Sequence, residues 1–99
     1  MTIKDDLKEF PVYLYRNKLL VQVDPIENWG CGLQAHHYIK QQDWKRNRSW
    51  YEARGISQKI IFVPVVLHEQ IHYTAVKNLN EADFESHYGY KRSDFLFKR

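Results

Sequence analysis

Residues 60–72 read Ile-Ile-Phe-Val-Pro-Val-Val-Leu-His-Glu-Gln-Ile-His, and the fold prediction starts from them. The first four residues form a compact run of β-prone side chains that ends at Pro64, which predicts a short strand. Beyond the proline, apolar residues recur at helical spacing, so we predict a helix over residues 65–76. Pro64 stands just before this helix, where a proline is tolerated. A strand that runs straight into a helix is therefore the centre of the expected fold.

Two histidines lie on the predicted helix. His68 and His72 are four residues apart, a spacing that puts both imidazole rings on one helix face. Neutral imidazole offers a lone pair near pH 7 and is the commonest metal ligand among side chains. One histidine could instead cap the helix while the other packs in the core. We favour a shared metal ion, because a second histidine cluster occurs upstream.

The upstream cluster is the adjacent pair His36-His37, which lies in a β-prone segment, residues 33–39. Neighbouring residues on a strand point to opposite faces, so the two rings cannot be equal ligands of one ion. This geometry favours a division of roles, in which one ring binds the metal and the other takes a proton from water. The alternative is a pair of surface histidines in a loop.

The other segments indicate a mixture of strands and helices. Residues 10–23 are rich in Val, Tyr and Leu and predict a β-hairpin, with Arg16-Asn17 as its turn. Residues 41–54 place aromatic side chains on one helix face, and residues 81–88 indicate a further turn of helix. Residues 89–99 are basic and aromatic, and they fit either a last strand or a tail.

Bulk composition narrows the class of protein. The chain has 99 residues, which is the size of one domain, and its 43% hydrophobic and 27% charged residues are typical of a globular protein. The formal charge of +3 and the pI near 9.0 are compatible with a polyanionic partner but do not require one. The single cysteine excludes an internal disulfide, and the longest apolar run is too short to span a bilayer. The charged N-terminus lacks the apolar core of a signal peptide, so we expect a cytoplasmic protein or a piece of a longer secreted one.

Four segments in this order resemble the HNH nucleases, also called His-Me finger or ββα-metal nucleases. They are Leu33-Gln34-Ala35-His36-His37-Tyr38-Ile39, Gly55-Ile56, Phe62-Val63-Pro64 and Leu67-His68-Glu69-Gln70-Ile71-His72. The resemblance is closest to the branch with an Ala-His-His signature in bacterial polymorphic toxins, and it extends over residues 33–76. It implies an α+β fold in a single domain, residues 1–99, in which an N-terminal β-hairpin precedes a ββα-metal core at about residues 33–78 with a helical insertion.

The resemblance also implies roles for individual residues. His36, His68 and His72 would bind one divalent ion (Zn, Mg, Mn or Ni), with a phosphate contact as the alternative role of His72. His37 would be the general base that activates water to attack a phosphodiester, and DNA is favoured over RNA as the substrate. A toxin of this kind implies an immunity protein as its inhibitor. It also implies action in the cytoplasm of a target cell, as a domain of a secreted toxin.

The chain departs from the family at the residue that orients the general base. Members commonly carry an Asn there, on the second strand, whereas this chain has Lys59 with Gln58 beside it. Gln58 could hold an imidazole by a hydrogen bond, and Lys59 could contact phosphate.

The segment between the two histidine clusters combines basic and aromatic residues. Such a combination suits a nucleic-acid backbone with stacked bases, and the alternative is a solvated amphipathic helix whose aromatic residues face the core. The candidates for contacts with nucleic acid are Lys45, Arg46, Arg48 and Arg54.

Two other functions fit parts of the pattern. His68-Glu69-x-x-His72 matches the zinc metalloprotease signature, in which two histidines bind zinc and the glutamate is the general base. A protease needs a third ligand downstream, and this reading leaves His36-His37 unexplained. A structural zinc site in a non-catalytic binding module is the other alternative. The further ligands available to these two alternatives are Cys31, Glu81, Glu85 and His87.

Overall fold

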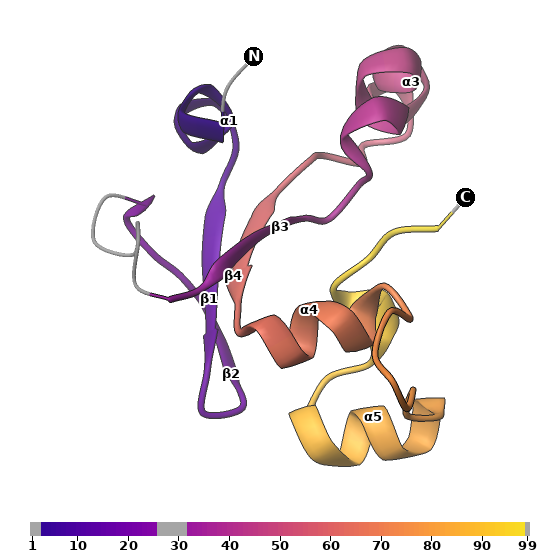
Figure 1. Ribbon diagram of the computed structural model, residues 1–99. Coiled ribbons are helices and arrows are strands. Elements are labelled where there is room, and N and C mark those ends of the chain that lie inside the picture. Colours follow the sequence, from indigo (N-terminus) through magenta and orange to yellow (C-terminus); the bar gives the residue numbers. More distant parts are fainter. Residues whose placement is uncertain (1–2, 26–31, 99) are drawn as a thin grey trace.

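The computed structural model describes residues 3–25 and 32–98 (Figure 1). The fold is α+β, as the sequence predicted, and the strands form one four-stranded mixed sheet. The elements in chain order are helix α1 (Ile3–Glu9), strands β1 (Val12–Arg16), β2 (Leu19–Gln22) and β3 (Gln34–His37), helix α3 (Gln41–Ala53), strand β4 (Ile60–Val63), helices α4 (Val65–Ile71) and α5 (Glu81–Tyr88), and the 3-10 helix η1 (Arg92–Asp94).

The sheet has the strand order β2-β1-β4-β3. β1 pairs antiparallel with β2 and parallel with β4, while β3 pairs antiparallel with β4 and forms an edge of the sheet. All four residues of β4 are buried, which explains why its sequence is a continuous apolar run without alternation. Figure 1 shows β4 passing almost directly into α4, which lies beside β3.

The predicted N-terminal hairpin is confirmed, but its turn lies one residue further along the chain. Arg16 still pairs with Leu19, so the two turn residues are Asn17 and Lys18. Both have positive φ values, 52° and 62°. Two-residue hairpin turns favour this left-handed geometry because it matches the twist of the strands, and Asn tolerates it well.

The sheet buries a separate apolar cluster on each of its faces. Ile61 and Val63 of β4 pack with side chains of α4 and α5, including Leu67 and Phe84. Ile60 and Phe62 point to the opposite face, where the apolar side of α1 covers them. Side chains of consecutive residues on β3 and β4 therefore lie on opposite faces of the sheet. The adjacent histidines His36 and His37 on β3 are separated in this way.

The helix after Pro64 is shorter than predicted. The prediction extended to residue 76, whereas α4 ends at Ile71 and Tyr73 adopts a φ of 59°. The buried side chain of Gln70 explains this end: its amide donates to the Lys77 carbonyl at 2.8 Å and accepts from the Leu79 backbone N–H at 2.9 Å. These bonds fold the following segment back onto the helix, so the helical spacing of the later apolar residues was misleading.

The other helix predictions are confirmed over 41–53 and 81–88, whereas α1 was not predicted. Residues 89–98 form neither a strand nor a tail: they contain η1, and Phe95 and Leu96 after it are buried. The C-terminal segment then passes the end of β3, where the Phe97 N–H donates to the Tyr38 carbonyl at 2.9 Å. In the part of the chain that the structure describes, no helix has the length and apolarity to cross a membrane.

Candidate metal centre

Three histidines from the two sequence clusters come together beside β3. His36, His68 and His72 each offer one ring nitrogen, and these three nitrogens all lie within 4.8 Å of one another. The sequence predicted this trio as the metal ligands, and the structure shows that it could hold one metal ion.

The fold places these rings by packing the residues next to them. Leu67 and Ile71 are fully buried against the sheet, and each directly precedes a histidine. Each step along a helix is a rotation of about 100°. His68 and His72 therefore both point to the same side of the buried face of α4, where they lie beside β3. His36 is on the same face of the sheet, since it pairs with Ile61, a member of the apolar cluster under α4.

Hydrogen bonds fix the direction in which the rings point. The Nε2–H of His36 donates to the Phe95 carbonyl, which leaves the lone pair on Nδ1. That Nδ1 lies 3.1 Å from His72 Nε2. The Nδ1–H of His68 donates to the Gln34 side-chain oxygen at 2.7 Å, which leaves its Nε2 unprotonated. Metal-binding histidines are typically oriented in this way, through a hydrogen bond from the other ring nitrogen.

Burial keeps these rings neutral. It lowers the pKa of His36 from 6.5 to about 3, against the opposing effect of the Phe95 carbonyl. Burial also lowers the pKa of His68, with a further contribution from His72, and the pKa of His72, with a further contribution from Lys40. Each nitrogen therefore keeps the lone pair that a metal requires at neutral pH.

The donor set decides which ions fit. Three imidazoles suit zinc, nickel or copper, whereas magnesium prefers oxygen ligands. Three protein ligands also leave a tetrahedral ion with one open position, which is typical of catalytic rather than structural zinc sites. The described residues therefore fit one transition-metal ion better than magnesium.

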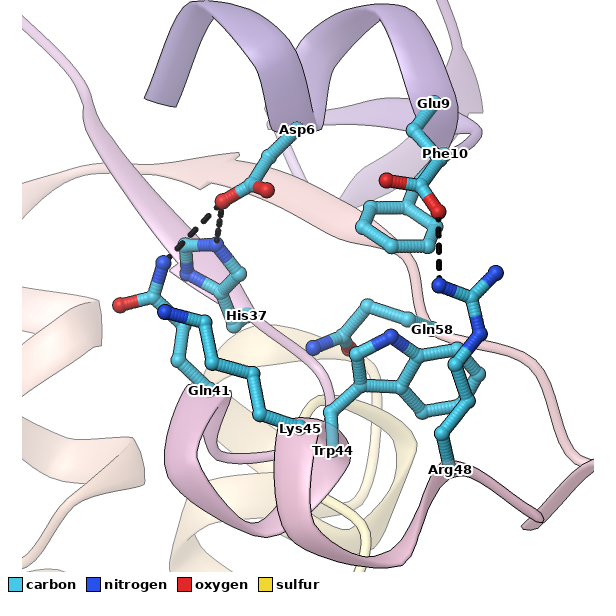
Figure 2. A pocket seen from close by; sticks show the side chains of 9 residues that line it. All are labelled: Asp6, Glu9, Phe10, His37, Gln41, Trp44, Lys45, Arg48 and Gln58. Carbon is cyan, nitrogen blue, oxygen red and sulfur yellow. Dashed lines mark hydrogen bonds and ion pairs between the residues drawn. The ribbon is translucent and has the colours of Figure 1, made fainter. Parts of the chain in front are cut away.

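His37 lies on the other face of the sheet, as expected for the neighbour of His36. Its Nε2 is 3.0 Å from the Asp6 carboxylate, and the side-chain amide of Gln41 donates to the same oxygen at 3.1 Å. Figure 2 shows these three side chains in a cleft between α1 and α3, with Lys45 beside them. The cleft has a volume of about 190 Å³.

Asp6 is the residue that sequence reasoning missed. Its carboxylate is buried, and 31 residues separate it from His37. In the sequence it stands in a charged N-terminal segment with no local pattern to mark it. Asp6, Leu7 and Phe10 all lie on the side of the N-terminal segment that faces the sheet. The spacing of these three residues is that of an amphipathic helix, and it was the one signal in the sequence that could have indicated a buried carboxylate.

The structure does not give Gln58 the expected contact with an imidazole. Its buried amide instead accepts from the Ile39 N–H at 2.8 Å and donates to the Ile39 carbonyl at 2.6 Å, which fastens the end of β3 to the residues before β4. The Lys59 ammonium lies over the rings of Tyr38 and Tyr13, at 4.4 and 5.5 Å from their centroids. Neither residue is hydrogen-bonded to His37, and a phosphate contact by Lys59 stays a prediction.

Two of the four basic candidates on the inserted segment, Lys45 and Arg48, line the cleft beside His37. Arg48 is engaged by Glu9 at 3.0 Å and by Glu52 at 3.3 Å. Arg54 lies just past α3 and stacks on Trp50, whereas Arg46 is exposed.

Three of the further ligands that the alternative functions require lie in the described part of the chain, and none of the three is in the cluster. Cys31 lies outside the described residues. Glu81 is paired with Arg92 and accepts a hydrogen bond from Tyr73 at 3.0 Å. Within residues 3–25 and 32–98, the three histidines are the one group that could hold a metal ion, so neither Glu85 nor His87 belongs to it.

Comparisons of this chain with protein-family models, with curated proteins and with solved structures found no match. The residues of the site and their geometry are therefore the basis for the function proposed below.

Proposed function

We propose that this chain is a metal-dependent endonuclease of the HNH type, which hydrolyses phosphodiester bonds, with DNA as its preferred substrate. The observation that carries the proposal is the trio His36, His68 and His72 on one face of the sheet, with His37 adjacent on the other. The order β3, β4, α4, with α3 inserted between the strands, supports it further, because a ββα-metal core has this order.

The chemistry divides between the two faces. His36, His68 and His72 hold the ion, which when bound stabilises the negative charge that develops on the phosphate. His37 accepts a proton from the attacking water through the ring nitrogen that does not face Asp6. The water oxygen forms a bond to phosphorus, the bond from phosphorus to the leaving sugar oxygen breaks, and that oxygen takes a proton from solvent.

A zinc protease is less well supported. The downstream ligands that such an enzyme would need are not part of the cluster, and the third histidine comes from upstream, on β3. Glu69 is exposed on α4, as an ordinary helix glutamate is. The structural-zinc alternative requires a fourth protein ligand, and the described residues supply three.

Charge and resemblance together suggest the biological setting. The net charge of +3 favours a polyanionic substrate, and exposed Lys45 and Arg46 offer phosphate contacts on α3. By its resemblance to toxin nucleases, the chain acts in the cytoplasm of a target cell as a domain of a secreted toxin. An immunity protein protects the producing cell.

The proposal is tested by plasmid cleavage. Purified protein is stripped with a chelator, and zinc, nickel, manganese or magnesium is added back. Nicking that returns with a metal and is absent from His37→Ala supports the endonuclease. His87→Ala, which changes an exposed histidine on α5, is the matched control and should cleave normally. Absence of cleavage with every metal, together with one tightly bound zinc per chain, would overturn the proposal in favour of the structural site.

A further inference from the structure

We propose that Asp6 is a positioning residue for His37, which holds this imidazole in one tautomer and one orientation in the cleft of Figure 2. The inference rests on the proposed function, because positioning matters only if His37 handles a proton. It assigns a role to α1, an element outside the segment that resembles the HNH nucleases.

The burial of the Asp6 carboxylate supports this role. Asp6 is only 4% exposed, and a buried charge is costly unless it is paired and hydrogen-bonded. Its Oδ2 has two donors from two different elements, His37 on β3 and Gln41 on α3. Three separate segments therefore meet at one oxygen atom, which fixes the imidazole relative to the sheet and to the inserted helix.

The tautomer of His37 also supports a positioning role for Asp6. An ionised carboxylate only accepts hydrogen bonds, so His37 must carry its proton on Nε2, 3.0 Å from the oxygen. The lone pair of the neutral ring is then on Nδ1, where it can take a proton. A carboxylate in this position also stabilises the imidazolium that forms, as in other carboxylate–histidine pairs.

Gln58, the residue that the sequence favoured for orienting the imidazole, has its hydrogen bonds elsewhere. Both ends of its amide bind the backbone of Ile39. Asp6 and Gln58 line the same cleft, but only Asp6 has a hydrogen bond with the histidine. The orienting function that HNH nucleases commonly give to an Asn on the second strand is thus supplied here from the N-terminal helix.

The most direct test observes His37 in the wild-type protein. Long-range ¹H–¹⁵N correlation spectra in alkaline buffer, with His37→Gln for assignment, report which ring nitrogen carries the proton. The expected result is a neutral ring with its proton on Nε2, in the metal-free and in the zinc-loaded protein. A proton on Nδ1 would overturn the inference, whether or not the protein cleaves DNA.

Kinetics supply the second test. Asp6→Ala should lower kcat between about tenfold and 10⁴-fold, the range between loss of an outer-shell partner and loss of a triad carboxylate, with KM and zinc stoichiometry unchanged. Asp6→Asn should also lower kcat, because an uncharged amide no longer stabilises the imidazolium that forms on His37. Its spectrum should keep the Nε2–H tautomer.

Glu9→Gln is the matched control. Glu9 also lines the cleft from the N-terminal segment, but it pairs with Arg48 instead of a histidine, so this variant should cleave like the wild type. Equal kcat values for Asp6→Ala, Glu9→Gln and wild type would overturn the positioning role while leaving the endonuclease intact. If Asp6→Ala fails to fold, the wild-type spectrum and the kinetics of Asp6→Asn still test whether Asp6 positions His37.

Discussion

His36 and His37 are neighbours on β3, yet the two faces of the sheet give them different surroundings. His36 is 1% exposed, donates to a backbone carbonyl and directs its other nitrogen at a second imidazole. His37 lines an open cleft and binds a carboxylate. The first environment favours a neutral ring that donates a lone pair to a cation, and the second holds a ring by a hydrogen bond to a carboxylate. A period of two along a strand is enough to separate these roles between adjacent residues.

The largest expected effect comes from removing the ring on the cleft side. His37→Ala should lower cleavage by roughly 10²- to 10⁴-fold, the usual contribution of a general base, because the proton acceptor is lost. Zinc affinity measured by calorimetry should stay at the wild-type value, since no ligand is removed. A large loss of zinc affinity would mean that His37 is itself needed for metal binding, so that the two faces do not have separate roles.

The reverse result is expected on the other face. His68→Ala should weaken zinc binding by more than about 100-fold, the upper end of the losses seen when only a supporting residue is removed. Glu69→Ala, one residue along α4 and exposed, is the matched control and should bind zinc normally. The two dissociation constants, measured by competition with a chelating dye, check this prediction.

Metal binding should also stabilise the fold, because the ligands come from β3 and α4. An ion at 100 times its dissociation constant adds about 2.7 kcal/mol to the free energy of unfolding. In a domain of this size that corresponds to an increase in Tm of roughly 10 °C or more. Thermal melts with zinc and with a chelator measure the difference, and His37→Ala should show the same increase as wild type.

A smaller effect is expected from the residue that supports His68. Gln34→Ala removes the acceptor of the His68 Nδ1–H. Loss of such a partner typically costs 10- to 100-fold in metal affinity, and the exposed position of this bond favours about tenfold. An affinity equal to that of wild type would show that the ring is oriented by helix packing alone.

Acid should destabilise the metal-free protein. Folded His36 takes up a proton only near its lowered pKa of about 3, whereas the unfolded chain does so near 6.5. Protons therefore favour the unfolded state over this interval, and the free energy of unfolding should fall as the pH drops from 6.5 toward 3. His68 and His72, which face the same ring, add to the effect because burial lowers their pKa values too. Urea titrations in a chelator should show a weaker dependence for His36→Gln.

Sequence reasoning was most successful where the signal is local. The buried strand β4 and the hairpin follow from runs of β-prone residues and the turn or proline that bounds them, and the shared face of His68 and His72 follows from helical spacing. The spacing of the two histidine pairs predicted one shared metal ion, and the resemblance to the HNH nucleases implied which three rings would bind it. The predicted end of the helix at residue 76 was wrong because the Gln70 amide binds backbone groups seven and nine residues further along the chain. The spacing of apolar residues gives no sign of these hydrogen bonds.

The support around the site was beyond prediction for the same physical reason. The Phe95 carbonyl that orients His36 is 59 residues away, and the Asp6 carboxylate is 31 residues from His37. Any of several carboxylates could have served, and only the packing of α1 on the sheet selects Asp6. A residue's chemistry could be read from the sequence, but its partner could not.

We propose that three histidines on one face of the sheet bind one metal ion while His37 remains on the other face. Anomalous diffraction from crystals of the zinc-loaded protein can locate the ion. We expect one zinc peak, about 2.0–2.1 Å from a ring nitrogen of each of His36, His68 and His72. Nδ1 should be the His36 ligand, with Asp6 still bonded to His37. A zinc ion bound by His37, or one that is not bound by His36, would show that the two faces do not have these separate roles.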